Sequence, residues 1–518
     1  MPRYKDYSYD QHKLLPIAFR EQILPGTFEY TLTYLIDHEV DLSVFEARYR
    51  NEETGAPAYD PGILLKIVLY AYARGIISSR EIERCCRENI IFMALSADTQ
   101  PHFSTLAGFI SSMSDEVSVL FRDVLLYCDE MGLIGKELFA IDGCKLPSNA
   151  SKEWSGTRAE FEKKKQKMEG AMRYLLKRHR ERDRSDEDVS VVEREEKQLK
   201  ALREKVRKIK DWLDHYDDKP GKGGKPKKSN ITDNESAKMK SAHGVIQGYD
   251  GVATVDAKHQ VIVRAEVFGD AQEHDLLVPM IEGTRESFQG IAGTIDVFEK
   301  TKLTADAGFH TEANMKRLFE EGIDGYVADT LFRKRDPRFA GASRYKERHH
   351  RERREARRKN GPVLFTHHDF HYDPERQLCI CPAGKKLYRN GSNVVINGYH
   401  AVKFCAPKSA CRPCHLRARC LKHPERTEVR QIHFFSGPAP NRPETFTSKM
   451  KRKIDSALGR AIYGRRLGTV EPVFANITRM LGLNRFTLRG KRKVNTQWLL
   501  YCLVHNIGKI HRYAPGWS

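Results

Sequence analysis

The sequence predicts a multidomain protein of the α/β class, and three observations support this prediction. The chain has 518 residues, enough for about three or four units of ordinary domain size. Its middle part orders strand, hairpin, helix, strand, helix and strand, as expected for a mixed sheet with helices packed on it. Charged residues make up 31% of the chain, and charged stretches separate this sheet from helical and cysteine-rich parts.

Residues 1–135 are predicted to form a helical N-terminal domain. Apolar residues recur at helical spacing in Pro61–Arg74, Ser79–Asn89 and Ser104–Met113, with short turns between these stretches. Basic residues on the short helices favour a helix-turn-helix-like DNA-binding module, although an ordinary helical bundle explains the pattern equally well. These basic residues are Arg74, Arg80, Arg84 and Arg87.

The first part of the sheet domain is predicted over residues 136–330. Leu138–Asp142 is a short apolar run that ends in Asp-Gly, so we expect a buried strand with Asp142 at its end. Gly244–Val255 and Gln260–Val267 alternate and are rich in β-branched residues, which predicts a β-hairpin. Further elements are expected as a helix at Glu273–Ser287, a strand at Lys302–Ala305, a helix at Glu312–Glu321 and a strand at Gly325–Ala328.

A helical hairpin inserted into this domain is predicted at residues 157–217. Apolar residues repeat there in steps of three and four, which is typical of a coiled-coil seam, and an acidic break at Asp183–Asp188 separates the two helices. Residues 219–230 are rich in Gly, Pro and Lys, which predicts a flexible basic linker. The seam residues are Phe161, Met168, Met172, Leu175, Leu199, Leu202, Val206, Ile209 and Leu213.

The charge balance points to a nucleic-acid partner. The chain has 89 Lys and Arg against 69 Asp and Glu, a net charge of +20. No apolar run approaches the ~20 residues that a membrane span needs, so no membrane partner is expected. The first twenty residues lack the apolar segment of a secretion signal, which predicts a cytoplasmic protein.

A basic, cysteine-rich insertion with a possible zinc site is predicted at residues 331–440. Within it, Arg333–Lys359 holds thirteen Lys or Arg against four acids, which indicates either phosphate contact or a solvated face. Four of its cysteines have a spacing that suits structural Zn²⁺ in tetrahedral geometry: Cys381, Cys411, Cys414 and Cys420. Cys379 and Cys405 are competing ligands, and unligated reduced cysteines are the alternative.

Three carboxylates stand where they could converge on metal ions. Asp142 and Asp306 each follow a predicted strand, and Glu471 lies on a helix of the C-terminal region 441–518. Together they could hold two divalent cations, Mg²⁺ or Mn²⁺, about 3.5–4 Å apart, which suits an in-line displacement at phosphorus. On a protein with a net charge of +20, this constellation predicts an enzyme that cleaves DNA strands.

Several sequence blocks resemble the bacterial insertion-sequence transposases of the DDE class. Three of these blocks contain the acids: AIDGCKLPSNASKEWSGT at 140–157, LTADAGFHTEANM at 303–315 and YGRRLGTVEPVFANI at 463–477. Together with four others they follow the family's order along almost the whole chain. The other four cover residues 59–86, 101–105, 243–263 and 481–510.

The resemblance implies a ribonuclease H-like catalytic core formed by residues 136–330 and 441–518, with an N-terminal domain that binds the element ends. Asp142, Asp306 and Glu471 match the family's metal-binding catalytic triad. The expected reaction is cleavage at the element ends to free 3′-hydroxyls, followed by their attack on target DNA. The partners would be double-stranded DNA, both the terminal inverted repeats and the target, and a second copy of the chain in a homodimeric synaptic complex near the nucleoid.

Residues that contact DNA are expected around Glu471 and before the last helix. Tyr463 and Arg466 match the family residues that precede its Glu. Many relatives carry Lys where this chain has Thr478, so Arg479 or Lys493 is expected to substitute for it. Phosphate contacts are further expected from the basic residues at the start of the last apolar helix, namely Arg485, Arg489 and Lys493.

Two alternatives stay open at this point. A catalytically inactive transposase relic would bind DNA in a sequence-specific manner without cutting it. A structure-specific nuclease would use the same three acids but would not join DNA ends, so only a strand-transfer measurement separates it from a transposase.

Overall fold

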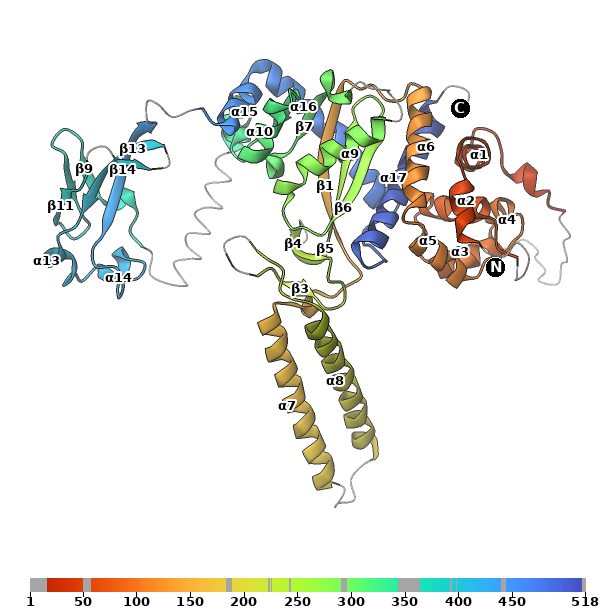
Figure 1. The fold of residues 1–518 in the computed structure, drawn as a ribbon, viewed down its shortest axis with the longest axis horizontal. Coiled ribbons are helices and arrows are strands. Elements are labelled where there is room, and N and C mark those ends of the chain that lie inside the picture. The colour runs from red at the N-terminus through yellow and green to blue at the C-terminus, as the bar shows by residue number, and fades with distance from the viewer. Residues whose placement is uncertain are drawn as a thin grey trace, which may run out of the picture. The chain divides into compact units, whose positions relative to one another are not determined.

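The computed structural model describes residues 16–514 except 50–56, 183–188, 222–223, 225, 242–243, 290–295, 343–363, 392–393, 397 and 439–443. Two compact units are present, one from residues 1–329 and 456–518 and one from residues 330–455 (Figure 1). Both combine helices with sheets, so the predicted multidomain α/β class is confirmed. Most of the basic run Arg333–Lys359 lies outside the described residues.

The first unit contains a mixed sheet in which six strands are described. The strand order is β4-β5-β1-β7-β8, and β6 also pairs with β5. Strand β5 is antiparallel to β1, β4 and β6, whereas β7 is parallel to both β1 and β8. The bounds are β1 Leu138–Pro147, β4 Ala237–Ser241, β5 Gly244–Asp256, β6 Ile262–Phe268, β7 Lys302–Ala305 and β8 Gly325–Val327.

Strand β1 is longer than the sequence predicts, and the expectation that Asp142 ends it is wrong. The strand continues through Gly143 to Pro147, because these residues pair with β5 from Val252 to Gly248. The Asp-Gly pair signals a turn locally, but the antiparallel partner overrides that signal. Asp142 therefore lies in the middle of a ten-residue strand.

Helices cover both faces of this sheet. Side chains alternate along β1, so Phe139 and Asp142 point to opposite faces. Phe288 of α9 stacks on Phe139 with ring centroids 5.7 Å apart, whereas Arg466 of α16 contacts Asp142. The helices after the hairpin are α9 Leu277–Gln289, α10 Glu312–Glu320, α16 Ala457–Ala475 and α17 Lys491–Tyr513.

The N-terminal helices pack directly on α17 and so belong to the same compact unit as the sheet. Tyr72 of α2 stacks on Tyr501 of α17 with ring centroids 4.6 Å apart. Helix α17 is buried on every side from Val494 to Ile507, which is the pattern of a helix enclosed between two layers. The N-terminal helices are α1 Phe28–Tyr34, α2 Pro61–Ala73, α3 Ser79–Glu88, α4 Ile90–Ser96, α5 Phe103–Ser112 and α6 Glu116–Glu130.

Two long helices, α7 (Arg158–Arg182) and α8 (Val189–His215), lie side by side and project from the sheet (Figure 1). Residues of the predicted seam are buried between them, and the base of the pair holds an apolar cluster. The cluster consists of Phe161, Ile209, Trp212 and Leu213.

Within the described residues, no helix is both long enough and apolar enough to span a membrane.

The segment 219–230 is not a flexible linker throughout, so this prediction is wrong at its C-terminal end. Ser229–Asn230 forms strand β3, which pairs with β2 (Ser155–Gly156). Asn230 is fully buried, and its amide donates to the Ser151 carbonyl oxygen at 2.8 Å. The buried amide anchors a stretch whose composition by itself indicates mobility.

The second unit contains another six-stranded sheet in its described part, with order β12-β13-β11-β10-β9 and β14 paired to β13. It extends past the predicted end at residue 440, because α15 (Phe446–Asp455) packs on α11 (Phe332–Arg335). Arg335 Nε lies 2.6 Å from Asp455 Oδ2. The other elements are β9 His371–Asp373, β10 Leu378–Ile380, β11 Lys386–Arg389, β12 Val394–Ile396, β13 Tyr399–Cys405, α13 Lys408–Cys411, α14 Arg417–Cys420 and β14 Gln431–Pro438.

His505 of α17 is a buried neutral imidazole. Its Nε2 lies 2.9 Å from the Gln260 carbonyl oxygen and its Nδ1 lies 3.0 Å from the Asn476 side-chain amide, so Nε2 donates and Nδ1 accepts. The pKa of His505 is lowered to about 4, mainly by burial and also by the charges of Lys509 and Arg512, against the opposing effect of the Gln260 hydrogen bond.

Acid is therefore expected to destabilise the protein through His505. Between the unfolded pKa of about 6.5 and the folded value, the unfolded chain binds more protons. The free energy of unfolding consequently falls as the pH falls, by at most about 1.4 kcal/mol per pH unit. His505→Gln keeps one donor and one acceptor but does not titrate. Urea unfolding of the wild type and of His505→Gln at several pH values measures this effect. If the free energy of unfolding changes with pH in the same way for both proteins, the prediction is wrong.

Candidate functional site

The candidate site lies beside β1, where this strand runs past the end of β7. Strand β7 pairs with β1 only from Leu138 to Ile141, and Asp142 is the next residue of β1. Asp306 directly follows β7, whose last residue Ala305 is the partner of Ile141. The two aspartates thus lie at the same level of neighbouring parallel strands.

Asp142 is held by a guanidinium and by its own strand. Arg466 Nη2 lies 2.6 Å from Asp142 Oδ2, and the Gly143 amide donates to Asp142 Oδ1 at 2.9 Å. Burial raises the pKa of Asp142 to about 6, with Arg466 lowering it and the charge of Asp306 raising it. Arg466 is itself only 6% exposed, so this ion pair lies inside the protein.

Asp306 caps the 3₁₀ turn η8 (Ala307–Phe309). Its Oδ1 accepts a hydrogen bond from the Gly308 amide at 2.7 Å. Burial raises the pKa of Asp306, the charge of Glu273 raises it further, and Arg466 lowers it. Both aspartates are therefore largely buried carboxylates, and the positive charge of the Arg466 guanidinium acts on both of them.

Glu471 does not join the two aspartates in this structure. It lies on α16 five residues after Arg466, but its side chain is exposed. The neighbouring Val470 and Val473 are fully buried and define the side of the helix that faces the protein. The side chain of Glu471 makes neither a hydrogen bond nor an ion pair with the described residues.

Three charged residues near the aspartates were missed by the sequence analysis. Glu273 lies in the 3₁₀ turn η6 (Glu273–Asp275), and its Oε1 is 2.5 Å from Lys145 Nζ. Asp250 lies on β5 directly across from Lys145 and is fully buried. Burial raises the pKa of Asp250, and the nearby charge of Glu273 raises it further. The signal for Asp250 was an acid inside an otherwise apolar strand pattern, whereas Glu273 belongs to no motif.

The donor set of this site suits a hard divalent cation, because it consists of carboxylate oxygens. Asp250 is not part of this donor set, because it is the register partner of Lys145 and so lies on the face of the sheet opposite Asp142. As the side chains stand, no group of three or more His, Cys, Asp or Glu in the described residues could hold a metal ion. Lys145 and Arg466 contact Glu273 and Asp142 instead.

Comparison with known families identifies the class of protein. A family model described as a transposase DDE domain matches residues 380–511, and one described as a transposase domain (DUF772) matches residues 18–112. The chain belongs to the DDE class of insertion-sequence transposases. It is thus a DNA transposase, and this class generally uses divalent metal ions. No curated protein matches the chain.

The match to the DDE domain includes Glu471 but neither Asp142 nor Asp306. The other match covers the N-terminal helices from α1 to α5. The assignment of the transposase to its family therefore does not depend on the two aspartates, and their role has to be argued from the site itself.

The expected DNA-contacting residues of the transposase lie in three different settings. Arg466 is buried against Asp142 in the DNA-free protein, and Tyr463 is half-buried one turn earlier on α16. Arg485 and Arg489 both contact Asn149, through its side-chain oxygen at 2.7 Å and its carbonyl oxygen at 2.7 Å, respectively.

The other two expected DNA-contacting residues, Arg479 and Lys493, are exposed. Arg479 lines a groove of about 850 Å³ together with the basic residues Arg74, Lys509 and Arg512. Lys493 lies in the first turn of α17.

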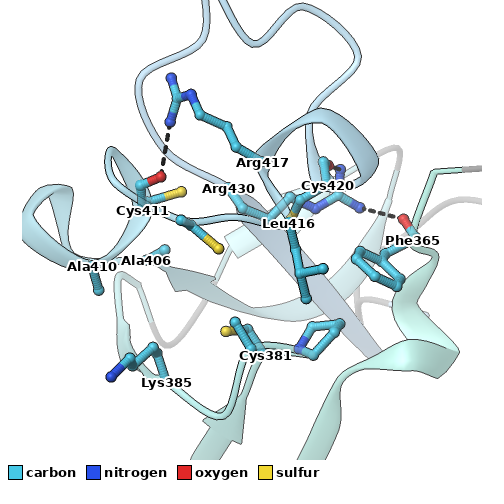
Figure 2. A pocket seen from close by; sticks show the side chains of 13 residues that line it. Phe365, Cys381, Lys385, Ala406, Ala410, Cys411, Leu416, Arg417, Cys420 and Arg430 are labelled. Carbon is cyan, nitrogen blue, oxygen red and sulfur yellow. Dashed lines mark hydrogen bonds between the residues drawn. The ribbon is translucent and has the colours of Figure 1, made fainter. Parts of the chain in front are cut away.

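The second unit of the transposase brings the four predicted zinc cysteines to one small cavity of about 30 Å³ (Figure 2). Cys379 and Cys405, the competing candidates, do not line it. Cys405 instead accepts a hydrogen bond from Asn390 at 3.3 Å, and Cys379 lies in the apolar core of this unit. The cavity is bordered by Cys381, Cys411, Cys414 and Cys420.

Two arginines hold the loops around this cavity. Arg417 donates to the Cys411 carbonyl oxygen at 3.1 Å, and Arg430 donates to the carbonyl oxygens of Cys420 and Phe365 at 3.1 and 3.2 Å (Figure 2). Burial raises the pKa of the Cys420 thiol, while Arg430 lowers it. These hydrogen bonds hold the backbone of the loops that carry Cys411 and Cys420.

Proposed function

We propose that the transposase cleaves DNA at the ends of an insertion sequence and transfers the freed 3′-hydroxyls to target DNA. Two divalent cations, Mg²⁺ or Mn²⁺, would be held by Asp142, Asp306 and Glu471. The observation that carries this proposal is that Asp142 and Asp306 lie at one level of neighbouring parallel strands, close enough for one charge to raise the pKa of the other.

The core of the transposase is proposed to be ribonuclease H-like, with residues 157–217 and the cysteine-rich unit as insertions. The strand order β6-β5-β1-β7-β8, with an antiparallel hairpin on one side of β1 and parallel strands on the other, supports this. In this arrangement the first aspartate lies on the central strand and the second follows the adjacent parallel strand.

The residues of the site have distinct proposed roles. When bound, the divalent cations neutralise charge at the scissile phosphate and activate the attacking oxygen. Asp142 and Asp306 supply oxygen ligands from rigid strands, which limits the reorganisation needed during the reaction. Arg466 balances the charge of Asp142 in the DNA-free protein. Glu471 is exposed, so it is proposed to complete the site in the DNA complex.

DNA is proposed to contact two basic regions of the first unit. One is the groove lined by Arg479, and the other consists of Arg485, Arg489 and Lys493. Arg485, Arg489 and Lys493 supply positive charge next to the residues that follow β1, where a strand leaving the site would pass. Phosphate contacts of this kind set affinity and register rather than sequence choice. The terminal inverted repeats and the target are the proposed DNA partners, and a homodimer would pair the two element ends.

The test uses a labelled DNA duplex that carries the boundary of the element. Its cleavage in Mg²⁺ or Mn²⁺ is measured for the wild type and for Asp306→Ala. We expect cleavage at the boundary by the wild type and none by the variant, because the variant loses a carboxylate of the site. DNA binding should be equal for both proteins. Equal binding without cleavage by either protein would favour the inactive relic, and cleavage without strand transfer would favour a nuclease.

The four cysteines of the second unit are proposed to hold one structural Zn²⁺. An all-thiolate set of four ligands suits tetrahedral zinc, and their convergence on one cavity from separate segments supports the proposal.

Purified transposase is therefore expected to contain about one zinc per chain by elemental analysis. Cys411→Ser should lose this metal and lower the melting temperature of the second unit, because structural zinc contributes directly to folding. Cys85→Ser, on helix α3 of the other unit, is the matched control and should keep the metal. Zinc-free wild-type protein, purified without chelators, would contradict the proposal.

A further inference from the structure

Nearly all of the net charge of the transposase belongs to its second unit. Residues 330–455 contain 30 Lys and Arg against 11 Asp and Glu, a net charge of +19, whereas the first unit contains 59 against 58. The run Arg333–Lys359 accounts for +9 of this excess, so residues 360–455 carry +10 without it. A unit of this charge attracts a polyanion such as DNA.

The sheet of the second unit packs its core on one face (Figure 1). Val402 and Phe404 of β13 belong to this core or pack against it, as does Leu387 of β11. So do Phe434 and Ile432, the register partners of the two β13 residues on β14. Successive side chains of a strand point to opposite faces, so the residues that alternate with these lie on the other face, here called the outer face. On these three strands it consists of Lys386, Tyr388, Tyr399, Ala401, Lys403, Cys405, Gln431, His433 and Phe435.

Three aromatic side chains of the outer face are exposed. Tyr388 is 53% exposed, Tyr399 43% and Phe435 59%. The rings of Tyr399 and Phe435 meet edge to face, with centroids 6.4 Å apart, and Tyr388 lies on the neighbouring strand β11 beside Cys405. Large aromatic side chains usually lie in a core, so several exposed rings on one face mark an interaction surface.

Positive charge lies among these rings. Lys403 of β13 is half-buried, and its register partner on β14 is His433. Burial lowers the pKa of His433, and the charge of Lys403 lowers it further. Lys386 of β11 is exposed, and neither lysine forms an ion pair with a described residue. The one acid that the described strands place on this face, Asp373 of β9, lies on an edge strand and accepts hydrogen bonds from two backbone amides. Both lysines therefore remain available to a phosphate.

We propose that the outer face of the second unit binds single-stranded DNA. Unpaired bases stack on its three exposed rings, and its two lysines hold the phosphates. A single strand fits this face better than a duplex, because the bases of a duplex are already stacked on each other and leave no ring faces for a protein to cover. The inference goes beyond the proposed function, since the second unit contains none of the three acids assigned to catalysis.

The test is binding of a short fluorescein-labelled oligothymidylate to the full chain, measured by fluorescence anisotropy without added divalent cations. The double variant Tyr388→Ala, Phe435→Ala should bind this single strand at least about tenfold more weakly, because stacked bases lose their rings. Its affinity for a duplex of the same length should be unchanged. The matched control is Tyr174→Ala, which removes a 63% exposed tyrosine from α7 of the other unit and should keep the wild-type affinity for the single strand.

Two further measurements make the outcome specific. The double variant Tyr388→Phe, Phe435→Tyr keeps both rings and should bind the single strand like the wild type, which separates stacking from a general effect on folding. Photo-cross-linking of an oligonucleotide that contains bromodeoxyuridine should label a peptide with Tyr388, Tyr399 or Phe435.

Three results would overturn the inference. The first is wild-type affinity of the double alanine variant for the single strand. The second is an equal loss of affinity for single strand and duplex, which would mean that the rings only support the fold or that charge alone binds DNA. The third is cross-linking confined to the first unit.

Discussion

Asp142→Asn is expected to abolish both DNA cleavage and strand transfer while DNA binding is retained. The substitution preserves the size of the side chain but removes the charge that would hold a cation at the reacting phosphate. Cations at such sites supply several kcal/mol of transition-state stabilisation, so a rate loss of about 1000-fold or more is expected. Cleavage of a labelled duplex and joining of a precut 3′-end measure the two steps separately.

The control for Asp142→Asn concerns Arg466, because this buried guanidinium loses its charged partner. Removing one member of a buried ion pair can cost about 3–5 kcal/mol, so the melting temperature of the variant has to be compared with that of the wild type. Asp306→Asn is the second variant, since the hydrogen-bonded partner of Asp306 is a backbone amide. Strand transfer retained by either well-folded variant would refute the assignment of the site.

Trp498→Ala is expected to lower the free energy of unfolding by about 3–5 kcal/mol, the usual cost of removing a large aromatic side chain from a core. Trp498 is fully buried, and a Cβ atom built on Gly251 of β5 would be only 3.0 Å from its indole ring. Its Nε1 donates to the Val252 carbonyl oxygen at 3.3 Å, and its ring stacks on Phe474. The side chain thus joins α17 to the sheet.

Chemical denaturation followed by circular dichroism measures this loss of stability. Leu467→Ala on α16 is the control, because Leu467 is 41% exposed and its removal should change stability by no more than about 0.5 kcal/mol. A cost below about 1 kcal/mol for Trp498→Ala would mean that the packing of α17 on β5 contributes little to the fold.

Much of the secondary structure could be predicted because its signals are local. The strand at Lys302–Ala305 is observed with the predicted bounds, and the helix predicted at Glu312–Glu321 ends one residue earlier. Pairing between strands that lie far apart in the sequence leaves no local signal in either strand. The prediction therefore ended β1 at Asp142, whereas the pairing with β5 extends the strand to Pro147.

The residues of the candidate site were likewise predictable from the sequence only in part. Asp142 and Asp306 stand out in the sequence because each follows an apolar run, and they do lie together. Asp250 and Glu273 belong to no motif, and they come near the aspartates only because β5 pairs with β1 and the turn after β6 folds back towards Lys145. The exposure of Glu471 likewise depends on how α16 lies on the sheet.

The sequence by itself determined the family, the order of the helices and strands, and the net positive charge that suits a DNA partner. The tertiary structure alone decided which acids share a buried site, that α17 is enclosed between the N-terminal helices and the sheet, and that four of the six clustered cysteines line one cavity. The physical reason is that periodicity and motifs reflect neighbours along the chain. Burial, ion pairing and charge balance depend instead on residues that the fold brings together from distant parts of the sequence.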